Sequence, residues 1–286
     1  MSALRIIVAG ASGSVGREAV ALLKKQGHRV TALSRTAGSL SSIADRVIAF
    51  DATTGIPELA GHDALLSTLG ASVAMRHRDM RSYRNVDYKA NLNLLHACQR
   101  AGIRRVVYVS AHIESGYAET AYIRAHEEVV NALSSTAGLS YTVIRPTGIF
   151  SAFGDMIDMS RRGAIPVIDG GGARTNPIHQ ADVAQACTNF IEQGPVEVSI
   201  GGPDILSRRD IAYLAFAVTE KRPRLVSAPA GLMRFGGTVV RPFNGRLGEL
   251  LQFVSKVSTV DAIAPKFGTR RLVDYFEELA RVTTNA

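Results

Sequence analysis

Three glycines, Gly10, Gly13 and Gly16, follow an apolar run from Leu4 to Val8 in an arrangement suited to binding phosphate. Glycines at this spacing allow a tight turn and a close approach of the backbone to a ligand. When such a turn opens a helix, the free N–H groups at the helix N-terminus can meet negative charge. The pattern predicts a site for the pyrophosphate of a dinucleotide.

A second apolar run ends at Ser34 and Arg35, about 20 positions past the glycines, where the usual NAD fingerprint has an acidic residue. That residue accepts hydrogen bonds from the hydroxyls of the adenosine ribose. Residues 32–36 instead read Ala-Leu-Ser-Arg-Thr, with one fixed cation and no carboxylate. Because a guanidinium suits a 2′-phosphate better than a bare diol, the sequence favours NADP(H) over NAD(H).

Apolar strands and amphipathic helices alternate through the first half of the chain, which predicts an α/β fold with a doubly wound parallel sheet of the Rossmann type. The expected strands are residues 5–9, 29–34, 46–50, 63–68, 105–110 and 141–145, and the expected helices are 14–26, 85–100 and 120–135.

The rhythm breaks after residue 148 into a Gly-rich, irregular stretch that includes residues 161–172. Regular structure is expected again in a helix at 180–192, a strand at 197–200, a helix from Ser207 to Val218 and a helix at 270–281. We therefore expect residues 1–150, joined by 176–200, to form an NADP-binding core. Residues 151–175 and 201–286 would form a smaller, irregular region that binds substrate or acts as a lid.

Composition indicates an ordinary globular chain of 286 residues with 46% hydrophobic residues. No apolar run approaches the roughly 18 residues of a membrane span, and the N-terminus enters a strand directly, so we expect no membrane span and a cytoplasmic location. Cys98 and Cys187 lie in helix-like segments outside any metal-ligand spacing, so we expect both to be buried and no metal to bind.

The net charge of +8 is concentrated towards the C-terminus, since residues 221–286 hold 11 Lys or Arg against 5 Asp or Glu, a balance of +6. This is either a solvated basic face or a field that attracts an anionic substrate or partner. Nucleic acid is not expected, because aromatic residues are only 6% and no nucleic-acid-binding motif is present. A second basic cluster follows the fourth strand and comprises Arg76, His77, Arg78, Arg81 and Arg84.

Further motifs follow the strands in order: Asp51 after the third, Ser-Thr-Leu-Gly at 67–70 after the fourth, and Arg-Pro-Thr-Gly at 145–148 after the sixth. With the glycine turn, Asn-Pro-Ile-His at 176–179 and Ala-Pro-Lys-Phe-Gly at 264–268, the chain resembles the atypical short-chain dehydrogenase/reductases. The resemblance is to their NAD(P)H-binding, NmrA-like and divinyl-reductase-like branch, and it covers nearly the whole length.

The resemblance implies a cofactor contact for residues at each strand end. The backbone of Ser12, Gly13, Ser14 and Val15 would meet the pyrophosphate, with Ser34, Arg35 and Thr36 around the 2′-phosphate; Asp51 and Ala52 would border the adenine; Thr68, Leu69 and Gly70 would lie towards the ribose; Ser110 would lie near the nicotinamide; and Pro146, Thr147, Gly148 and Ile149 would pass its carboxamide.

Standard members of this superfamily carry Tyr-x-x-x-Lys on the helix after the fifth strand, where the Lys holds the ribose and lowers the pKa of the Tyr. Here the motif is Tyr122-Ile-Arg-Ala-His126, with His in place of Lys. The two residues could form a modified acid/base pair, His126 could be a cofactor contact alone, or both could belong to a fold that binds NADP without turnover.

Ser110 and His112 complete the catalytic candidates, since His titrates near neutral pH and His112 should lie close to the cofactor. His179 precedes a helix and is interpreted as structural. Phe150, Phe153, Met156 and Met159 could line a substrate pocket or belong to the core.

The leading hypothesis is an NADPH-dependent reductase of a small carbonyl or conjugated substrate. The alternatives are a nucleotide-sensing regulator or assembly factor of the NmrA type, and an epimerase or dehydratase. The oligomeric state is not indicated by the sequence.

Overall fold

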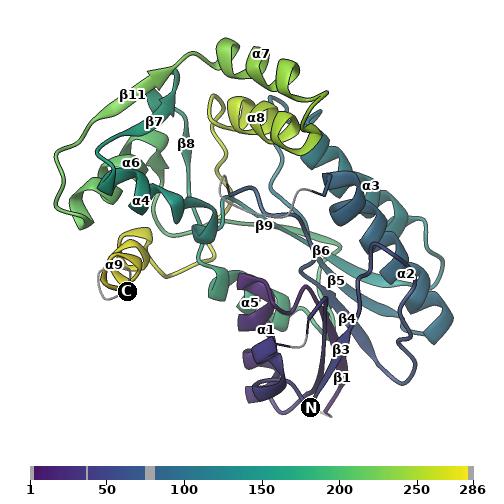
Figure 1. Ribbon diagram of the computed structural model, residues 1–286. Coiled ribbons are helices and arrows are strands. Elements are labelled where there is room, and N and C mark those ends of the chain that lie inside the picture. Colours follow the sequence, from purple (N-terminus) through teal and green to yellow (C-terminus); the bar gives the residue numbers. More distant parts are fainter. Residues whose placement is uncertain (1–2, 37, 75–80, 283–286) are drawn as a thin grey trace.

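The computed structural model describes residues 3–36, 38–74 and 81–282. At its centre lies a parallel sheet of seven strands in the order β3-β2-β1-β4-β5-β6-β9 (Figure 1). The strands are β1 (Arg5–Ala9), β2 (Arg29–Ser34), β3 (Arg46–Ala49), β4 (Ala64–Ser67), β5 (Arg105–Val109), β6 (Ser140–Pro146) and β9 (Glu197–Ile200). The strand order reverses between β1 and β4, and ligands of open parallel sheets bind outside the strand ends at such a point.

Helices cover both faces of this sheet because its strands are apolar on both sides. On one face lie α1 (Ser14–Lys25) and α5 (Gln180–Asn189), and on the other lie α2 (Ala90–Ala101), α3 (Ala121–Ser134) and the π-helix η2 (Arg84–Lys89) (Figure 1). Each face has its own buried core. The doubly wound fold is therefore confirmed, and the expected helix at 85–100 is the continuous pair η2 and α2.

The remaining segments gather beside the carboxyl ends of the strands. There α4 (Asp155–Arg161), α6 (Arg208–Val218) and α9 (Leu272–Val282) pack around a parallel pair, β7 (Ile165–Ile168) and β11 (Leu225–Ala228). Shorter elements are η1 (Gly38–Ser42), η3 (Phe150–Phe153), η4 (Asp169–Gly171), β8 (Arg174–Thr175) and β10 (Leu206–Ser207). This part is more regular than expected, because β7 takes its partner β11 from far along the chain.

Helix capping and side-chain packing account for local details of this part. Ser207 and Asp210 form a complete capping box at the start of α6, as the sequence indicated. Phe150 and Phe153 are buried in the core around α6 and α9, and Met156 and Met159 pack against it. Of the two roles expected for these four residues, packing in the core is the one that their contacts show.

Two helices, α7 (Ala230–Val240) and α8 (Gly245–Val257), had no predicted counterpart. They pack closely together, and α8 also lies against α3. Glycine disfavours helix in isolation, and α7 contains Gly231, Gly236 and Gly237. Gly237 is needed for packing, because a Cβ there would lie 2.9 Å from the carbonyl oxygen of Gly248.

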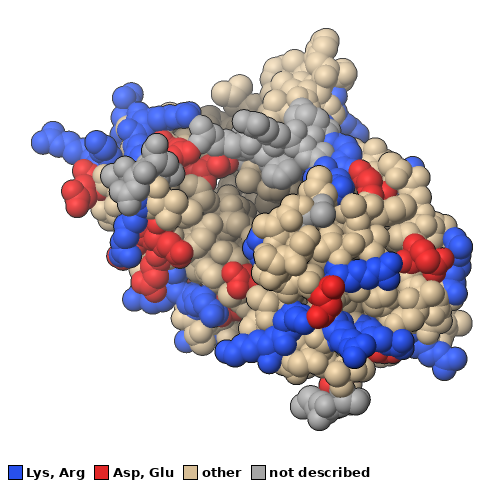
Figure 2. Space-filling view, turned by 60° about the horizontal axis from the view of Figure 1, so that its bottom comes forward, with Lys and Arg blue, Asp and Glu red and all other residues tan. Residues whose placement is uncertain are grey.

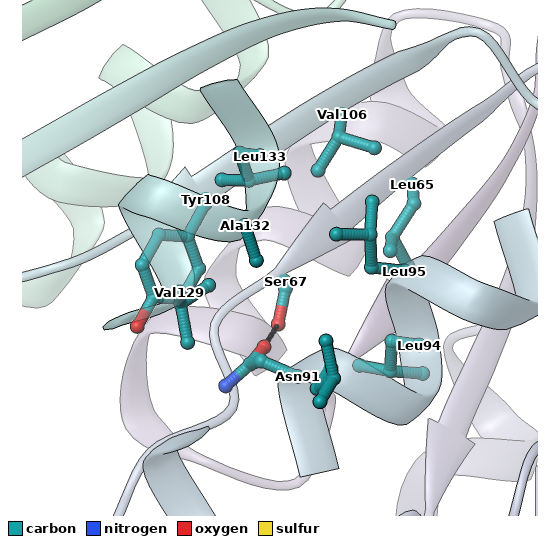
Figure 3. A pocket seen from close by; sticks show the side chains of 11 residues that line it. Leu65, Ser67, Asn91, Leu94, Leu95, Val106, Tyr108, Val129, Ala132 and Leu133 are labelled. Atoms are coloured by element: carbon teal, nitrogen blue, oxygen red, sulfur yellow. Dashed lines mark hydrogen bonds between the residues drawn. The ribbon is translucent and has the colours of Figure 1, made fainter. Parts of the chain in front are cut away.

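Figure 3 shows a small cavity between α2, α3 and the strands β4 and β5. Its lining side chains are apolar apart from Tyr108 and the hydrogen-bonded pair Ser67 and Asn91, whose Oγ and Oδ1 atoms are 2.5 Å apart. It therefore belongs to the core rather than to a ligand site. Cys98 and Cys187 are buried free thiols, as expected. Among the described residues, no helix has the length and apolar character needed to cross a membrane.

Candidate functional site

The turn after β1 is built from glycines that have no room for a side chain. Gly10 has φ of +76°, and a Cβ on it would lie 2.9 Å from the backbone of Thr68 and Leu69. A Cβ on Gly16 would lie only 2.3 Å from the carbonyl oxygen of Gly10. The turn is therefore pressed against the end of β4, and its shape depends on glycine.

The N-terminus of α1 emerges directly from this turn. Gly13 precedes its first residue, and no side chain caps the helix. Ser12, Gly13 and Ser14 are exposed, whereas Val15 is buried. The uncapped N–H groups at this helix start, in a turn where Gly10 and Gly16 leave no room for a side chain, form a cradle that fits a pyrophosphate.

A groove of about 230 Å³, open to solvent, runs from this turn along the strand ends of β2 and β4. It brings together ten of the residues expected to bind the cofactor: Gly10, Ser12, Gly13, Ser34, Arg35, Asp51, Ala52, Thr68, Leu69 and Gly70. Its other lining residues are Leu33, Phe50, Thr53, Ala71, Arg81 and Val86. Figure 2 shows a hollow between the two parts of the molecule, with Lys and Arg side chains along their edges.

Two arginines and one carboxylate set the charge of this groove. Arg81 Nη1 lies 2.8 Å from Asp51 Oδ2, and the backbone N–H of Thr53 donates to Asp51 Oδ1 at 2.9 Å. Burial opposes ionisation of Asp51, but the hydrogen bonds from Thr53 and the charges of Arg81 and Arg35 outweigh it and lower its pKa. Asp51 is therefore an anion between two cations.

Arg81 is a lining residue that the sequence placed only in a basic cluster. Of that cluster, Arg84 instead pairs with Glu128 at 3.0 Å, away from the groove. Arg76, His77 and Arg78 lie outside the described residues. The position of Arg81 in the segment after β4 could have predicted its place in the groove, because ligands of parallel sheets bind outside the carboxyl ends of the strands.

The residues expected at the nicotinamide end lie at the ends of β5 and β6 but do not line this groove. Ser110 is buried, with Arg145 Nη1 at 3.4 Å from its Oγ. Thr147 donates to the carbonyl oxygen of Asn176 at 2.5 Å. Gly148 lies against the ring of Phe153, where a Cβ would be 2.8 Å from Cζ. These contacts hold the strand ends rigidly in place.

Tyr122 lies in an aromatic cluster formed by three elements. Its ring centroid is 5.0 Å from that of Tyr83, 4.7 Å from that of His126 and 4.7 Å from that of Phe253 on α8. Burial raises the pKa of Tyr122 above its ordinary value, and the charge of Asp87 adds to this. The phenol is thus held in its neutral form, as a proton donor must be before it acts.

His126 lies in the interior and is only 3% exposed. Its Nδ1 is 2.5 Å from the hydroxyl of Tyr108, and its Nε2 is 3.3 Å from Oδ1 of Asp87. Burial lowers the pKa of His126 to about 3, so the ring is neutral. Neither nitrogen points into the groove, and its expected contact with the cofactor stays a prediction.

Asp87 is not among the site residues that the sequence predicted. It is fully buried, it accepts a hydrogen bond from the N–H of Ala71 at 3.1 Å, and it lies against Gly70. Burial raises its pKa to about 8. It belongs to the π-helix η2. Helices of this type are rare in proteins, and those that occur often lie at functional sites. Asp87 and His126 therefore pack against Gly70, which lines the groove.

His112 has an arrangement suited to proton transfer. Its Nε2 lies 3.1 Å from Oε1 of Glu114, while its Nδ1 is buried with no partner among the described residues. A carboxylate that holds one nitrogen of a His fixes the ring and leaves the other nitrogen for chemistry. His179 instead caps α5, with its Nδ1 accepting from the N–H of Ala181 at 3.1 Å. This contact agrees with the structural role that the sequence indicated for His179.

These observations describe a groove with a phosphate cradle at the glycine turn and with Arg35 and Arg81 among its lining residues. No cluster of His, Cys, Asp or Glu among the described residues is suited to hold a metal ion. A dinucleotide fits this arrangement, because its pyrophosphate would meet the bare helix start and its adenosine end would meet the arginines.

Comparison with known proteins agrees with this geometry. The family model described as NAD(P)H-binding matches residues 10–194. The divinyl chlorophyllide a 8-vinyl-reductase of Zea mays is 25% identical over 80% of this chain, which spans 62% of that protein's length. The photosystem II assembly factor Ycf39 of Synechocystis sp. is 26% identical over 84% of this chain and 75% of its own length.

Solved structures show the same fold. The structure of MoeE5 in complex with UDP-glucuronic acid and NAD superposes with a TM-score of 0.69, covering 98% of this chain and 99% of that one at 16% identity. The NAD(P)H-binding model covers more than half of the sequence, from the glycine turn through α5 and beyond. This chain belongs to the NAD(P)H-binding family of atypical short-chain dehydrogenases/reductases.

Proposed function

We propose that the protein binds NADP(H) in preference to NAD(H) and reduces a small carbonyl or conjugated substrate in the cytoplasm. The observation that carries the cofactor proposal is that Arg35 and Arg81 line the same groove at the end of β2. Asp51, the carboxylate among the lining residues of this groove, already accepts hydrogen bonds from Arg81 and Thr53 and is a poor acceptor for ribose hydroxyls. Two cations favour a 2′-phosphate.

In this proposal each expected residue has one task. The backbone of residues 12–15 holds the pyrophosphate, Ser34, Arg35 and Thr36 hold the 2′-phosphate, and Asp51 and Ala52 border the adenine. The ribose lies over residues 68–70, and Ser110 with residues 146–149 borders the nicotinamide. When bound, NADPH supplies a hydride.

The chain itself must orient the substrate, exclude water and supply a proton. Tyr122 is one donor, because its phenol is neutral and lies beside α8, which covers this end of the sheet. His112, fixed by Glu114, is the other. In this scheme His126 positions Tyr122 through their ring contact and need not ionise, which suits an imidazole in place of the usual Lys.

The substrate class is supported by the relative from Zea mays, whose name describes reduction of a vinyl group. The positive charge of the C-terminal part favours an anionic substrate. The second candidate function is a regulator or assembly factor that binds NADP(H) without turnover. It is favoured by His126 being buried where the enzymes have Lys, and by the relative named as an assembly factor.

Fluorescence titration of NADPH and NADH tests the cofactor proposal, and we expect NADPH to bind at least tenfold more tightly. Equal affinities would overturn the assignment of Arg35 and Arg81. A screen of aldehydes, quinones and enones for NADPH oxidation tests turnover, and we expect at least one class to be reduced. Tight NADPH binding with no substrate consumed would favour the regulator.

A further inference from the structure

The outer face of α7 carries large apolar side chains that no other part of the described chain covers. Leu232 is 65% exposed, Phe235 67%, Val239 50% and Phe243, just beyond the helix, 90%. Positions 232, 235 and 239 share one face of a helix, so the side chains form a single patch. Monomeric proteins rarely expose such patches without an interaction to make.

The opposite side of α7 is fixed to the rest of the molecule. Gly237 meets the backbone of Gly248 on α8, and a Cβ on Gly248 would lie 2.7 Å from Arg241. Because this contact uses glycines, the two helices approach closely and α7 is held rigidly on α8. In Figure 1, α7 lies at the outer edge of the molecule with its other side turned away from α8. The patch therefore lies on a helix that is held in place at the edge of the molecule.

Basic residues are concentrated in the sequence on both sides of the patch residues. The sequence from 221 to 248 contains six Lys or Arg residues and no Asp or Glu. Arg234 and Arg241 are exposed on α7 or at its end. Lys221, Arg222 and Arg224 are exposed on the approach to β11. We call Leu232, Phe235, Val239, Phe243, Arg234 and Arg241 together the α7 surface.

We propose that the α7 surface binds an anionic lipid membrane. Helices that lie in the membrane interface combine Phe and Leu on one face with Lys and Arg beside them, and both features are present here. The apolar side chains would enter the boundary between headgroups and acyl chains, and the arginines would meet lipid phosphates. A second copy of this chain is a poorer occupant, because it would bring the same positive charge to the contact.

Flotation of the full chain with vesicles tests the proposal. We expect binding to vesicles of phosphatidylcholine with phosphatidylglycerol, little binding to phosphatidylcholine alone, and loss of binding at high salt, which screens the arginines. The double variant Phe235→Ser with Phe243→Ser should lose binding about tenfold or more, because each phenyl ring then stays in water. Arg234→Gln with Arg241→Gln should lose binding by about tenfold, on anionic vesicles only.

The matched control is Val196→Ser with Ile205→Ser, since these residues are 61% and 55% exposed on other elements. It should bind vesicles like the parent, and every variant should keep the parental NADPH affinity and circular dichroism. Equal binding to neutral vesicles, or full binding by the phenylalanine variant, would overturn the proposal. So would the absence of vesicle binding together with a dimer, seen by sedimentation, that the phenylalanine variant abolishes.

Discussion

The Oδ1 atom of Asp87 lies 3.3 Å from Nε2 of His126, and both side chains are buried behind Gly70. Burial raises the pKa of the carboxyl to about 8 and lowers that of the imidazole to about 3. Each shift disfavours charge, so the folded protein holds one proton on this pair and no net charge. His126 lies on the helix α3 at the position where the resemblance leads us to expect a Lys.

We predict that this pair gives the protein its highest stability on the acid side of neutrality. Above pH 6.5, the ordinary pKa of His, an unfolded chain carries no proton on either group, whereas the folded pair keeps one until the pH passes about 8. The folded state therefore loses stability as the pH rises through this range, by about 2 kcal/mol. Between the ordinary pKa of Asp and 6.5 both states bind one proton, so the contribution is flat.

Asp87→Asn tests this directly through urea unfolding at a series of pH values. The amide cannot ionise, so the loss of stability between pH 6.5 and 8 should disappear. The variant should instead lose stability as the pH falls below 6.5, because His126 binds a proton more readily in the unfolded chain. The pH of greatest stability would thus move upward. Profiles of the same shape for parent and variant would show that Asp87 is ionised in the folded protein.

Gly16→Ala should damage the cofactor groove and the fold together. The new Cβ would lie 2.3 Å from the carbonyl oxygen of Gly10, so the turn must move, at a cost of about 1–3 kcal/mol in unfolding free energy. NADPH affinity should fall as well. Gly172→Ala is the matched control, since nothing lies within 4 Å of its Cβ position, and it should leave both measurements unchanged. Normal NADPH binding by Gly16→Ala would mean that the turn is not the phosphate cradle.

The fold and the adenosine end of the groove could be predicted because they depend on local patterns. Gly10, Gly13 and Gly16 lie within one turn, and each strand end is marked by an apolar run followed by a polar or glycine residue. Burial on both faces makes such strands readable without any knowledge of their neighbours. Ten expected residues consequently meet in one groove.

What could not be predicted depends on contacts between distant segments. The burial of His126 follows from Tyr108 on β5 and Asp87 on η2, neither of which the Tyr-x-x-x-His spacing reveals. Arg81 reaches Asp51 only because the chain returns past the strand ends. The glycines of α7 disfavour a helix in isolation. The close contact between Gly237 and Gly248 of α8 explains their presence, and this contact is not visible in the sequence.

Arg81→Gln should reduce the affinity for NADPH more than that for NADH. The substitution removes one cation beside the expected 2′-phosphate and leaves Asp51 with one charged neighbour fewer, so the carboxylate would repel the phosphate. Because hydrogen bonds to charged groups contribute about 1.5–3 kcal/mol, the loss should be about tenfold to a hundredfold. Fluorescence titration measures it.

Arg84→Gln is the control for Arg81→Gln, since Arg84 pairs with Glu128 and does not line the groove. It should bind both nucleotides like the parent. An equal loss of NADPH and NADH binding in Arg81→Gln would show that Arg81 supports the groove but does not read the phosphate.

Tyr122→Phe and His112→Gln decide which residue supplies the proton to a reduced substrate. Phenylalanine keeps the ring that packs on Tyr83, His126 and Phe253, so thermal stability and NADPH affinity should be unchanged. A lost general acid lowers kcat by about 10²–10⁴-fold, whereas loss of a merely structural hydroxyl would leave kcat almost unaltered. We expect Tyr122→Phe to show the larger loss, because its phenol is neutral and lies on the helix α3 in register with the family's Tyr. Tyr213→Phe, on the surface of α6, should have no effect. Normal turnover by Tyr122→Phe with a large loss in His112→Gln would assign the proton to His112, and normal turnover by both would exclude each as the acid.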